Sequence, residues 1–154
     1  LIAAGVKDSK ALTDERALAL AALIDKTALS TSVLIMKPLA YNMRYEQVRE
    51  RGGNLNTLLA LGHIAALKHA FAPRMRIWQR PRAEEDIAVA AASILARGAF
   101  LQTVRLMSHE AEIGRIPKGG GEAATNAARR LVEKKGVDAL RHYVKLHFAN
   151  TTKL

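Results

Sequence analysis

Apolar positions recur at helical spacing over most of the chain and at strand-like spacing in three short segments. After a predicted N-cap at Thr13, residues 17, 18, 20, 21, 23 and 24 are apolar, which predicts a helix of about three turns. Four further helices are predicted at 38–51, 55–71 after a cap at Asn54, 122–135 and 137–144, and another follows the acids at 84–86. Apolar or β-branched runs predict strands at 1–6, 30–36 and 75–79. Strands alternating with helices, followed by helices alone, predict an α/β domain with a helical C-terminal part.

The charge balance changes this picture by indicating a polyanionic partner. The 154 residues contain 24 Lys and Arg against 14 Asp and Glu, a net charge of +10. Such an excess favours nucleic acid, because Lys and Arg release counterions when they neutralise phosphates. The chain has no cysteine, no signal-peptide pattern and no uninterrupted apolar run approaching about 18 residues. We therefore expect a soluble, cytoplasmic protein that uses neither disulfides nor thiolate metal sites.

Three consecutive acids precede the alanine-rich helix and raise a choice between a metal site and a helix cap. Glu84, Glu85 and Asp86 stand directly before the run IAVAAAS. Acids stabilise the positive end of most helices, so capping is favoured on local grounds.

Three loops carry residues that could contact an anion. Ser9 and Lys10 follow the first predicted strand, where they could bind a phosphate or form a simple turn with a solvated lysine. Asn54 follows two glycines that end a helix, and Lys118 lies in a glycine-rich loop that offers backbone N–H groups. His147 alone favours a structural role.

Read in order, five motifs resemble ribonuclease HIII, a branch of the type 2 ribonucleases H. They are GVKDSKAL, YN with GNLNTLLALGHIAAL, RAEEDIAVAAASILARGAFL, IPKGGG and VKLHFANTTK, and they cover essentially the whole chain. Ribonuclease HII is the alternative within the same family. There, however, the position of IPKGGG resembles a Gly-Tyr-Pro whose tyrosine senses a single ribonucleotide, whereas here that tyrosine is missing and Lys118 follows Pro117.

The resemblance implies a ribonuclease H-like fold, with a mixed β-sheet flanked by helices and a helical C-terminal part. It implies an endoribonuclease, acting as a monomer, that cuts the RNA strand of RNA–DNA hybrids to leave 5′-phosphate ends. Two divalent cations, Mg²⁺ or Mn²⁺, would serve as cofactors, since two such ions can activate water and stabilise the leaving oxygen. Glu84 would be the catalytic metal ligand, with Glu85 and Asp86 left as capping or solvated acids. The implied substrate-binding residues are Ser9, Lys10, Asn54, Ser93 and Lys118.

The sequence departs from the family pattern in its acids. An Asp-Glu pair on the first strand and an Asp on a later strand are both missing. Apart from Asp8 in the DSK motif and the acids at 84–86, the remaining acids fall in predicted helices or at their ends. Residues 1–154 are therefore interpreted as a type 2 ribonuclease H catalytic domain that lacks its first catalytic strand and a segment near 73–74. Two explanations stay open: omitted segments, which we favour because the substrate-facing motifs are intact and the chain lacks an initial Met, or a catalytically inactive hybrid-binding module.

Overall fold

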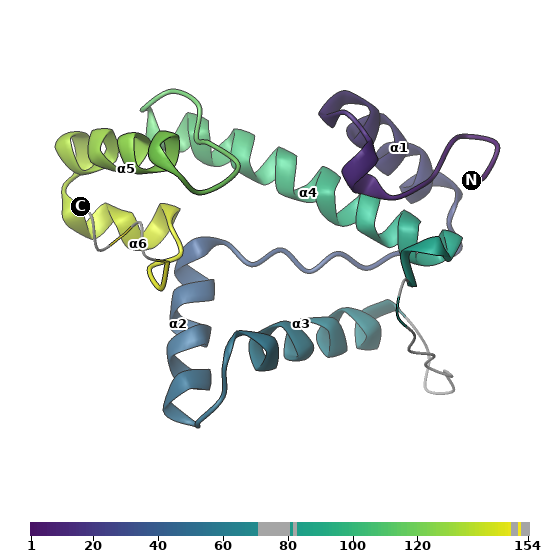
Figure 1. Cartoon of the computed structure of the whole chain (residues 1–154), viewed down its shortest axis with the longest axis horizontal. Coiled ribbons are helices and arrows are strands. Elements are labelled where there is room, and N and C mark those ends of the chain that lie inside the picture. The colour runs from purple at the N-terminus through teal and green to yellow at the C-terminus, as the bar shows by residue number, and fades with distance from the viewer. Residues whose placement is uncertain (71–80, 82, 149–150, 152–154) are drawn as a thin grey trace. The chain divides into compact units, whose positions relative to one another are not determined.

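The structure, a computed structural model, describes residues 1–70, 81, 83–148 and 151 (Figure 1). Its elements are the 3₁₀ helices η1 (Ser9–Ala11), η2 (Ala83–Glu85) and η3 (Val137–Ala139), and the α-helices α1 (Asp14–Thr27), α2 (Pro38–Glu50), α3 (Leu55–Ala70), α4 (Ile87–Ala111), α5 (Glu122–Lys135) and α6 (Leu140–Tyr143). The chain divides into two compact units. The first contains Leu1–Ile35 and His63–Gln102, and the second contains Met36–Gly62 and Thr103–Leu154.

The predicted mixed β-sheet is wrong for the part of the chain that the structure describes, where no strand occurs. Residues 1–6 form turns, in which Gly5 donates to the carbonyl of Ile2 at 2.9 Å and itself adopts φ of 79°. The turn satisfies backbone N–H and C=O groups by local hydrogen bonds, in place of the bonds to a neighbouring strand that a sheet would supply. The 30–36 segment has neither helix nor strand, and Val33, Leu34 and Ile35 are exposed. A segment with high strand propensity joins a sheet only where a second segment supplies hydrogen-bond partners for its backbone. The predicted strand at 75–79 lies outside the described residues.

The predicted helices whose first residues carry a capping side chain or a proline are confirmed. Thr13 accepts a hydrogen bond from the Arg16 N–H at 3.2 Å and begins α1, while Pro38 occupies the first turn of α2. Asp86 accepts from the Ala88 N–H at 2.8 Å, so the predicted capping role of this acid is confirmed at α4. The predicted helix at 137–144 forms as η3 followed by the single turn of α6.

In the first unit, α1 and α4 pack against each other through small residues. A Cβ added to Gly98 of α4 would come within 2.7 Å of the Ala21 Cβ on α1, so only glycine permits this approach. Beside this contact lies a buried apolar cluster made of Val6, Leu20, Ile24, Ala90, Ala91 and Ile94. Removing such side chains from water is the main stabilising term of a small core.

The second unit has its own apolar cluster. Its buried members are Ala111, Ala128, Leu131 and Leu140. The short helix α6 packs against α2 and α5 (Figure 1). Gly136 ends α5 with φ of 81°, a conformation that glycine adopts without strain.

One described helix, α4, is long and apolar enough to cross a membrane by length and composition. Its 18-residue window has a mean hydropathy of 1.6 and is 22% buried. The expectation from the sequence concerned uninterrupted apolar runs, and this average over a window does not test it. The core helix of a soluble protein passes the same test, so length and composition alone do not assign α4 to a membrane.

The contact between Gly98 and Ala21 predicts an unusual response to a helix-favouring substitution. Alanine in a helix interior gains about 1 kcal/mol over glycine. Gly98→Ala should nevertheless lower the free energy of unfolding by about 1 kcal/mol, because overpacking costs about 1–3 kcal/mol. Urea unfolding measures the change. The matched control is Gly119→Ala, where an added Cβ meets nothing within 4 Å. A Gly98→Ala protein as stable as the parent would contradict the close packing.

Candidate substrate-contact site

Ser9 and Ser93, predicted from distant motifs to contact substrate, lie side by side in the first unit. Ser9 stands in η1 and is only 8% exposed. Its hydroxyl donates to the Ser93 hydroxyl on α4, with 3.4 Å between the two Oγ atoms. Asp8 stabilises the turn by accepting from the Lys10 N–H at 3.1 Å. The predicted turn therefore forms, and the same loop places the Ser9 hydroxyl beside the Ser93 hydroxyl of α4.

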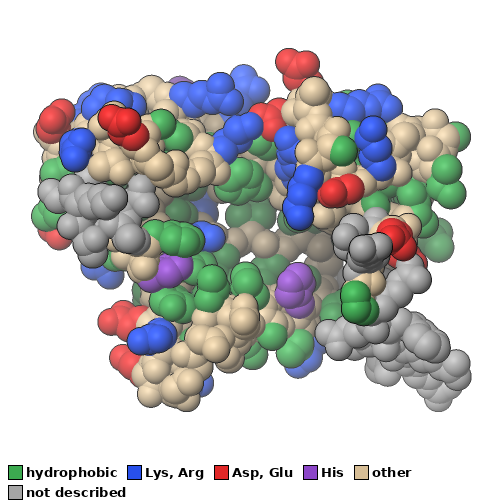
Figure 2. Space-filling model, viewed as in Figure 1, with side chains coloured by type: hydrophobic (Ala, Val, Ile, Leu, Met, Phe, Trp, Pro, Cys, Tyr) green, Lys and Arg blue, Asp and Glu red, His purple; other side chains and the backbone are tan. Residues whose placement is uncertain are grey.

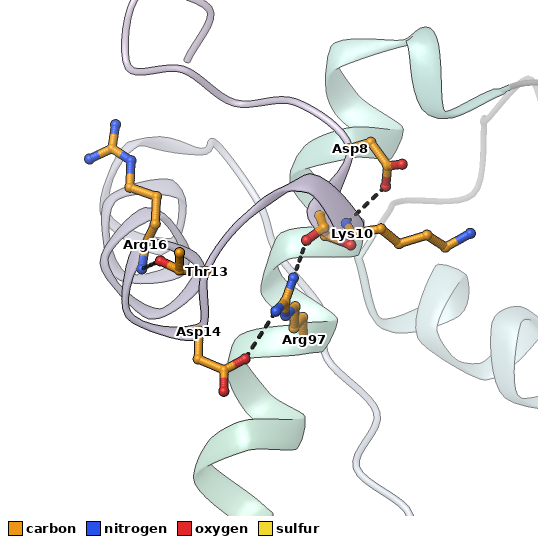
Figure 3. A network of polar contacts seen from close by, with 7 residues as sticks. Asp8, Lys10, Thr13, Asp14, Arg16 and Arg97 are labelled. Carbon is orange, nitrogen blue, oxygen red and sulfur yellow. Dashed lines mark hydrogen bonds and ion pairs between the residues drawn. The ribbon is translucent and has the colours of Figure 1, made fainter. Parts of the chain in front are cut away.

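Arg97 holds this loop against α4. Its Nη1 donates to the carbonyl oxygen of Ser9, and its Nη2 lies 2.9 Å from the Asp14 Oδ1 at the start of α1 (Figure 3). The Arg97 and Asp14 side chains retain 25% and 31% of their exposure, so both are partly withdrawn from water. Charge-assisted bonds in such surroundings contribute more than exposed ion pairs.

Sequence reasoning missed Arg97 and Asp14 as parts of the site. Asp14 also lies in the first turn of α1, where the helix dipole favours an acid. Arg97 stands four residues after Ser93, which places both on one helix face, and this spacing was the available signal.

Lys10 presents its charge away from this network. Figure 3 shows its side chain extending away from Arg97, and the residue is exposed. The paired hydroxyls of Ser9 and Ser93 can offer hydrogen bonds to an anion, and Lys10 can offer the neutralising charge.

The role of Glu84 as a metal ligand stays a prediction. The Glu84 backbone lies in η2, but its side chain lies outside what the structure describes. Glu85 is exposed, and Asp86 is engaged in capping. No group of three or more His, Cys, Asp or Glu that could hold a metal occurs among the described residues. Those residues therefore do not by themselves fit a two-metal centre.

Asn54 and Lys118 belong to the second unit. The Asn54 Oδ1 accepts from the Thr57 N–H at 3.2 Å, and the Thr57 hydroxyl accepts from the Asn54 N–H at 3.3 Å. The predicted capping role of Asn54 is thus confirmed. Lys118 is exposed in the loop between α4 and α5, where the Ile116 N–H donates to the Ser108 hydroxyl at 2.9 Å. Substrate contact by either residue stays a prediction.

A family model described as ribonuclease HII matches residues 66–151, more than half of the 154-residue chain. The chain belongs to the ribonuclease HII family. The matched range includes Glu84, Ser93 and Lys118, whereas Ser9, Lys10 and Asn54 precede it.

Similar proteins within this family carry the name ribonuclease HIII, which confirms the resemblance seen in the motifs. The chain is 36% identical to ribonuclease HIII of Protochlamydia amoebophila, over 96% of this chain and 56% of that protein. It is 34% identical to ribonuclease HIII of Bacillus subtilis, over 97% of this chain and 56% of that protein. A crystal structure of Bst-RNase HIII in complex with Mn²⁺ superposes with a TM-score of 0.85 at 30% identity, covering 99% of this chain and 58% of that one. The chain thus spans little more than half the length of these relatives.

The role of Arg97 in this ribonuclease HII family chain can be tested through stability. Arg97→Ala removes the hydrogen bond to the Ser9 carbonyl and leaves the partly buried Asp14 without this cation. We expect the free energy of unfolding to fall by about 1.5–3 kcal/mol, the range for hydrogen bonds to charged groups. Arg97→Lys should recover only part of the loss, since an ammonium lacks the two-pronged guanidinium geometry.

The control for this prediction is Arg105→Ala, which removes an exposed arginine from the same helix. Surface substitutions of this kind change stability by about 0.5 kcal/mol or less. Equal midpoints of urea unfolding for Arg97→Ala and Arg105→Ala would contradict the role assigned to Arg97.

Proposed function

We propose that the full-length protein is an endoribonuclease that hydrolyses the RNA strand of RNA–DNA hybrids. The observation that carries the proposal is the 3.4 Å contact between Ser9 and Ser93, because it joins two motifs 84 residues apart that share the family resemblance. Membership of the ribonuclease HII family supports the same function.

The charge of the chain fits a polyanionic substrate. The net charge is +10, and α5 alone carries Arg129, Arg130, Lys134 and Lys135. Figure 2 shows Lys and Arg side chains in the region where Figure 1 draws α5. Such residues supply the sequence-independent part of nucleic-acid affinity, while defined hydrogen bonds position the backbone.

Ser9, Ser93 and Lys10 provide a phosphate contact in this proposal. When phosphate binds, the Ser9 hydroxyl exchanges its hydrogen bond to Ser93 for one to the ligand, so that both hydroxyls donate to non-bridging phosphate oxygens and Lys10 neutralises the charge. Arg97 does not take part directly, since its guanidinium is directed to Ser9 and Asp14. Its contribution is to hold η1 so that the Ser9 hydroxyl stays beside α4.

Divalent metal dependence forms part of the proposal, with Glu84 as one ligand. It is supported by the Mn²⁺ complex of the similar Bst-RNase HIII and by the preference of hard cations for carboxylate oxygens. When bound, such ions activate water and stabilise the leaving oxygen. The further ligands are not found as a cluster among the described residues, so we assign no others.

One alternative has an observation of its own. The lack of a carboxylate cluster in the described part of the chain would also suit a hybrid-binding module without catalysis. The same basic surface and phosphate-contact residues would serve it. Cleavage by the wild-type protein separates the two functions.

The test uses purified full-length protein and a hybrid with an end-labelled RNA strand. Wild-type protein should cleave the RNA strand in the presence of Mg²⁺ or Mn²⁺, and EDTA should abolish this cleavage. Glu84→Ala should lower the cleavage rate by about 100-fold or more, since even residues behind metal ligands account for about 10–100-fold. Glu85→Ala, which changes the neighbouring exposed acid, is the matched control and should retain activity.

Each outcome of this assay selects one interpretation. Full activity of Glu84→Ala would contradict the ligand assignment. Wild-type protein that binds the hybrid without cleaving it in either metal would select the binding module. Preference for a DNA duplex containing one ribonucleotide would favour junction cleavage of the ribonuclease HII type over hydrolysis of long hybrids.

A further inference from the structure

Asn42 organises the backbone that follows α6 in the second unit. Its side-chain Nδ2 donates to the carbonyls of Arg141 at 3.0 Å and Val144 at 2.9 Å. Its Oδ1 accepts from the Leu146 N–H at 3.0 Å. One side chain on α2 thus satisfies three backbone groups about 100 residues away in the sequence. Residues 145–148, hereafter the KLHF segment, continue directly from this fixed point.

The KLHF segment packs on the ring of Tyr41, the residue next to Asn42. Tyr41 is 4% exposed, and its ring stacks on the Tyr45 ring, with centroids 5.9 Å apart. The His147 ring lies 5.4 Å from the Tyr41 ring, and the Lys145 Nζ lies 4.5 Å from its centroid. The segment is therefore fixed by its backbone on Asn42 and by its side chains on Tyr41.

The KLHF segment combines exposed aromatic rings with an exposed cation. Lys145 and His147 are exposed, and Phe148 retains 52% of its exposure. The His147 and Phe148 rings contact each other, with centroids 4.1 Å apart. Burial and the charge of Lys145 lower the pKa of His147.

Exposed rings beside a lysine suit a nucleic-acid strand better than an apolar protein surface. Bases stack on aromatic side chains without regard to sequence, and an adjacent cation binds the backbone phosphate. The surroundings contain the acids Glu46 and Asp138 and the cation Arg141, which line one pocket together with Asn42 and Leu146. Because the chain as a whole carries +10, a polyanion is the favoured partner.

We propose that Lys145, His147 and Phe148 form a second nucleic-acid contact that takes an unpaired base and its phosphate, with Asn42 as the positioning residue. This inference rests on the proposed hybrid substrate, but it uses none of the residues of the Ser9–Ser93 site. It gives a single role to two motifs, YN and VKLHFANTTK, that the phosphate contact leaves unexplained.

Binding of two labelled hybrids by full-length protein in EDTA tests the proposal, one hybrid blunt and one with a single-stranded overhang. Phe148→Ala should weaken binding of the overhang hybrid by about tenfold, the effect of one base–aromatic stack, and change the blunt hybrid little. The matched control is Phe100→Ala, since Phe100 is an aromatic residue of similar exposure at 47%. Lys145→Ala should weaken binding and reduce its salt dependence, whereas Lys26→Ala should do neither.

The positioning role of Asn42 has a separate readout. Asn42→Ala should reproduce the loss seen with Phe148→Ala, and the double variant should show no further loss, because both changes disable one surface. Asn126→Ala, which changes an exposed asparagine on α5, is the control. Additive losses would contradict the assignment of Asn42, while Phe148→Ala and Lys145→Ala test the surface even if Asn42→Ala unfolds.

The remaining outcomes overturn the proposal in distinguishable ways. If wild-type protein cleaves hybrids and Phe148→Ala and Lys145→Ala bind both probes like wild type, the second contact is wrong and the proposed function stands. If wild-type protein binds neither hybrid, both fail. If Phe148→Ala converts an oligomer to a monomer in sedimentation and leaves hybrid binding unchanged, the surface is a protein interface.

Discussion

The candidate site depends on the two contacts that the guanidinium of Arg97 makes. It contacts the Ser9 carbonyl in η1 and the Asp14 carboxylate at the start of α1, so one side chain of α4 fixes two separate elements. Gly98, the next residue, allows α1 to approach α4 closely. A loop held in this way keeps its polar side chains in place before any ligand arrives, which lowers the entropy that binding must overcome.

The second unit applies the same principle with a neutral side chain. Asn42 bonds to three backbone groups and Tyr41 supports the residues that follow, so the KLHF segment is ordered without regular secondary structure. In both units a polar side chain on a helix orders a distant loop. Binding residues commonly lie on loops, and rigid helices give them precise positions.

Local physics explains which parts of the fold could be predicted from the sequence. Thr13, Asn54 and Asp86 were expected as caps, because a cap depends only on residues two or three positions away. The segments at 1–6 and 30–36 were expected as strands on propensity, and strand formation depends on a distant partner that propensity does not reveal. The first of these became a turn at Gly5.

The residues of the candidate site likewise include some that the sequence indicated and some that it did not. The family resemblance indicated Ser9 and Ser93, and the structure brings them together. Arg97 and Asn42 were not predicted, since their partners lie 83 to 104 residues away in the sequence. The four-residue spacing from Ser93 places Arg97 on the same helix face but does not identify those partners. Glu84 was selected by the resemblance alone, and its role still depends on the cleavage assay.

The salt dependence of hybrid binding by Lys10→Ala tests the central claim most directly, that the ordered η1 loop presents a phosphate contact. Affinity of the full-length wild type and variant would be measured in EDTA across a series of salt concentrations. Loss of one phosphate contact should weaken binding at low salt and reduce the slope of log affinity against log salt by about one. An unchanged slope together with an unchanged affinity would contradict the account.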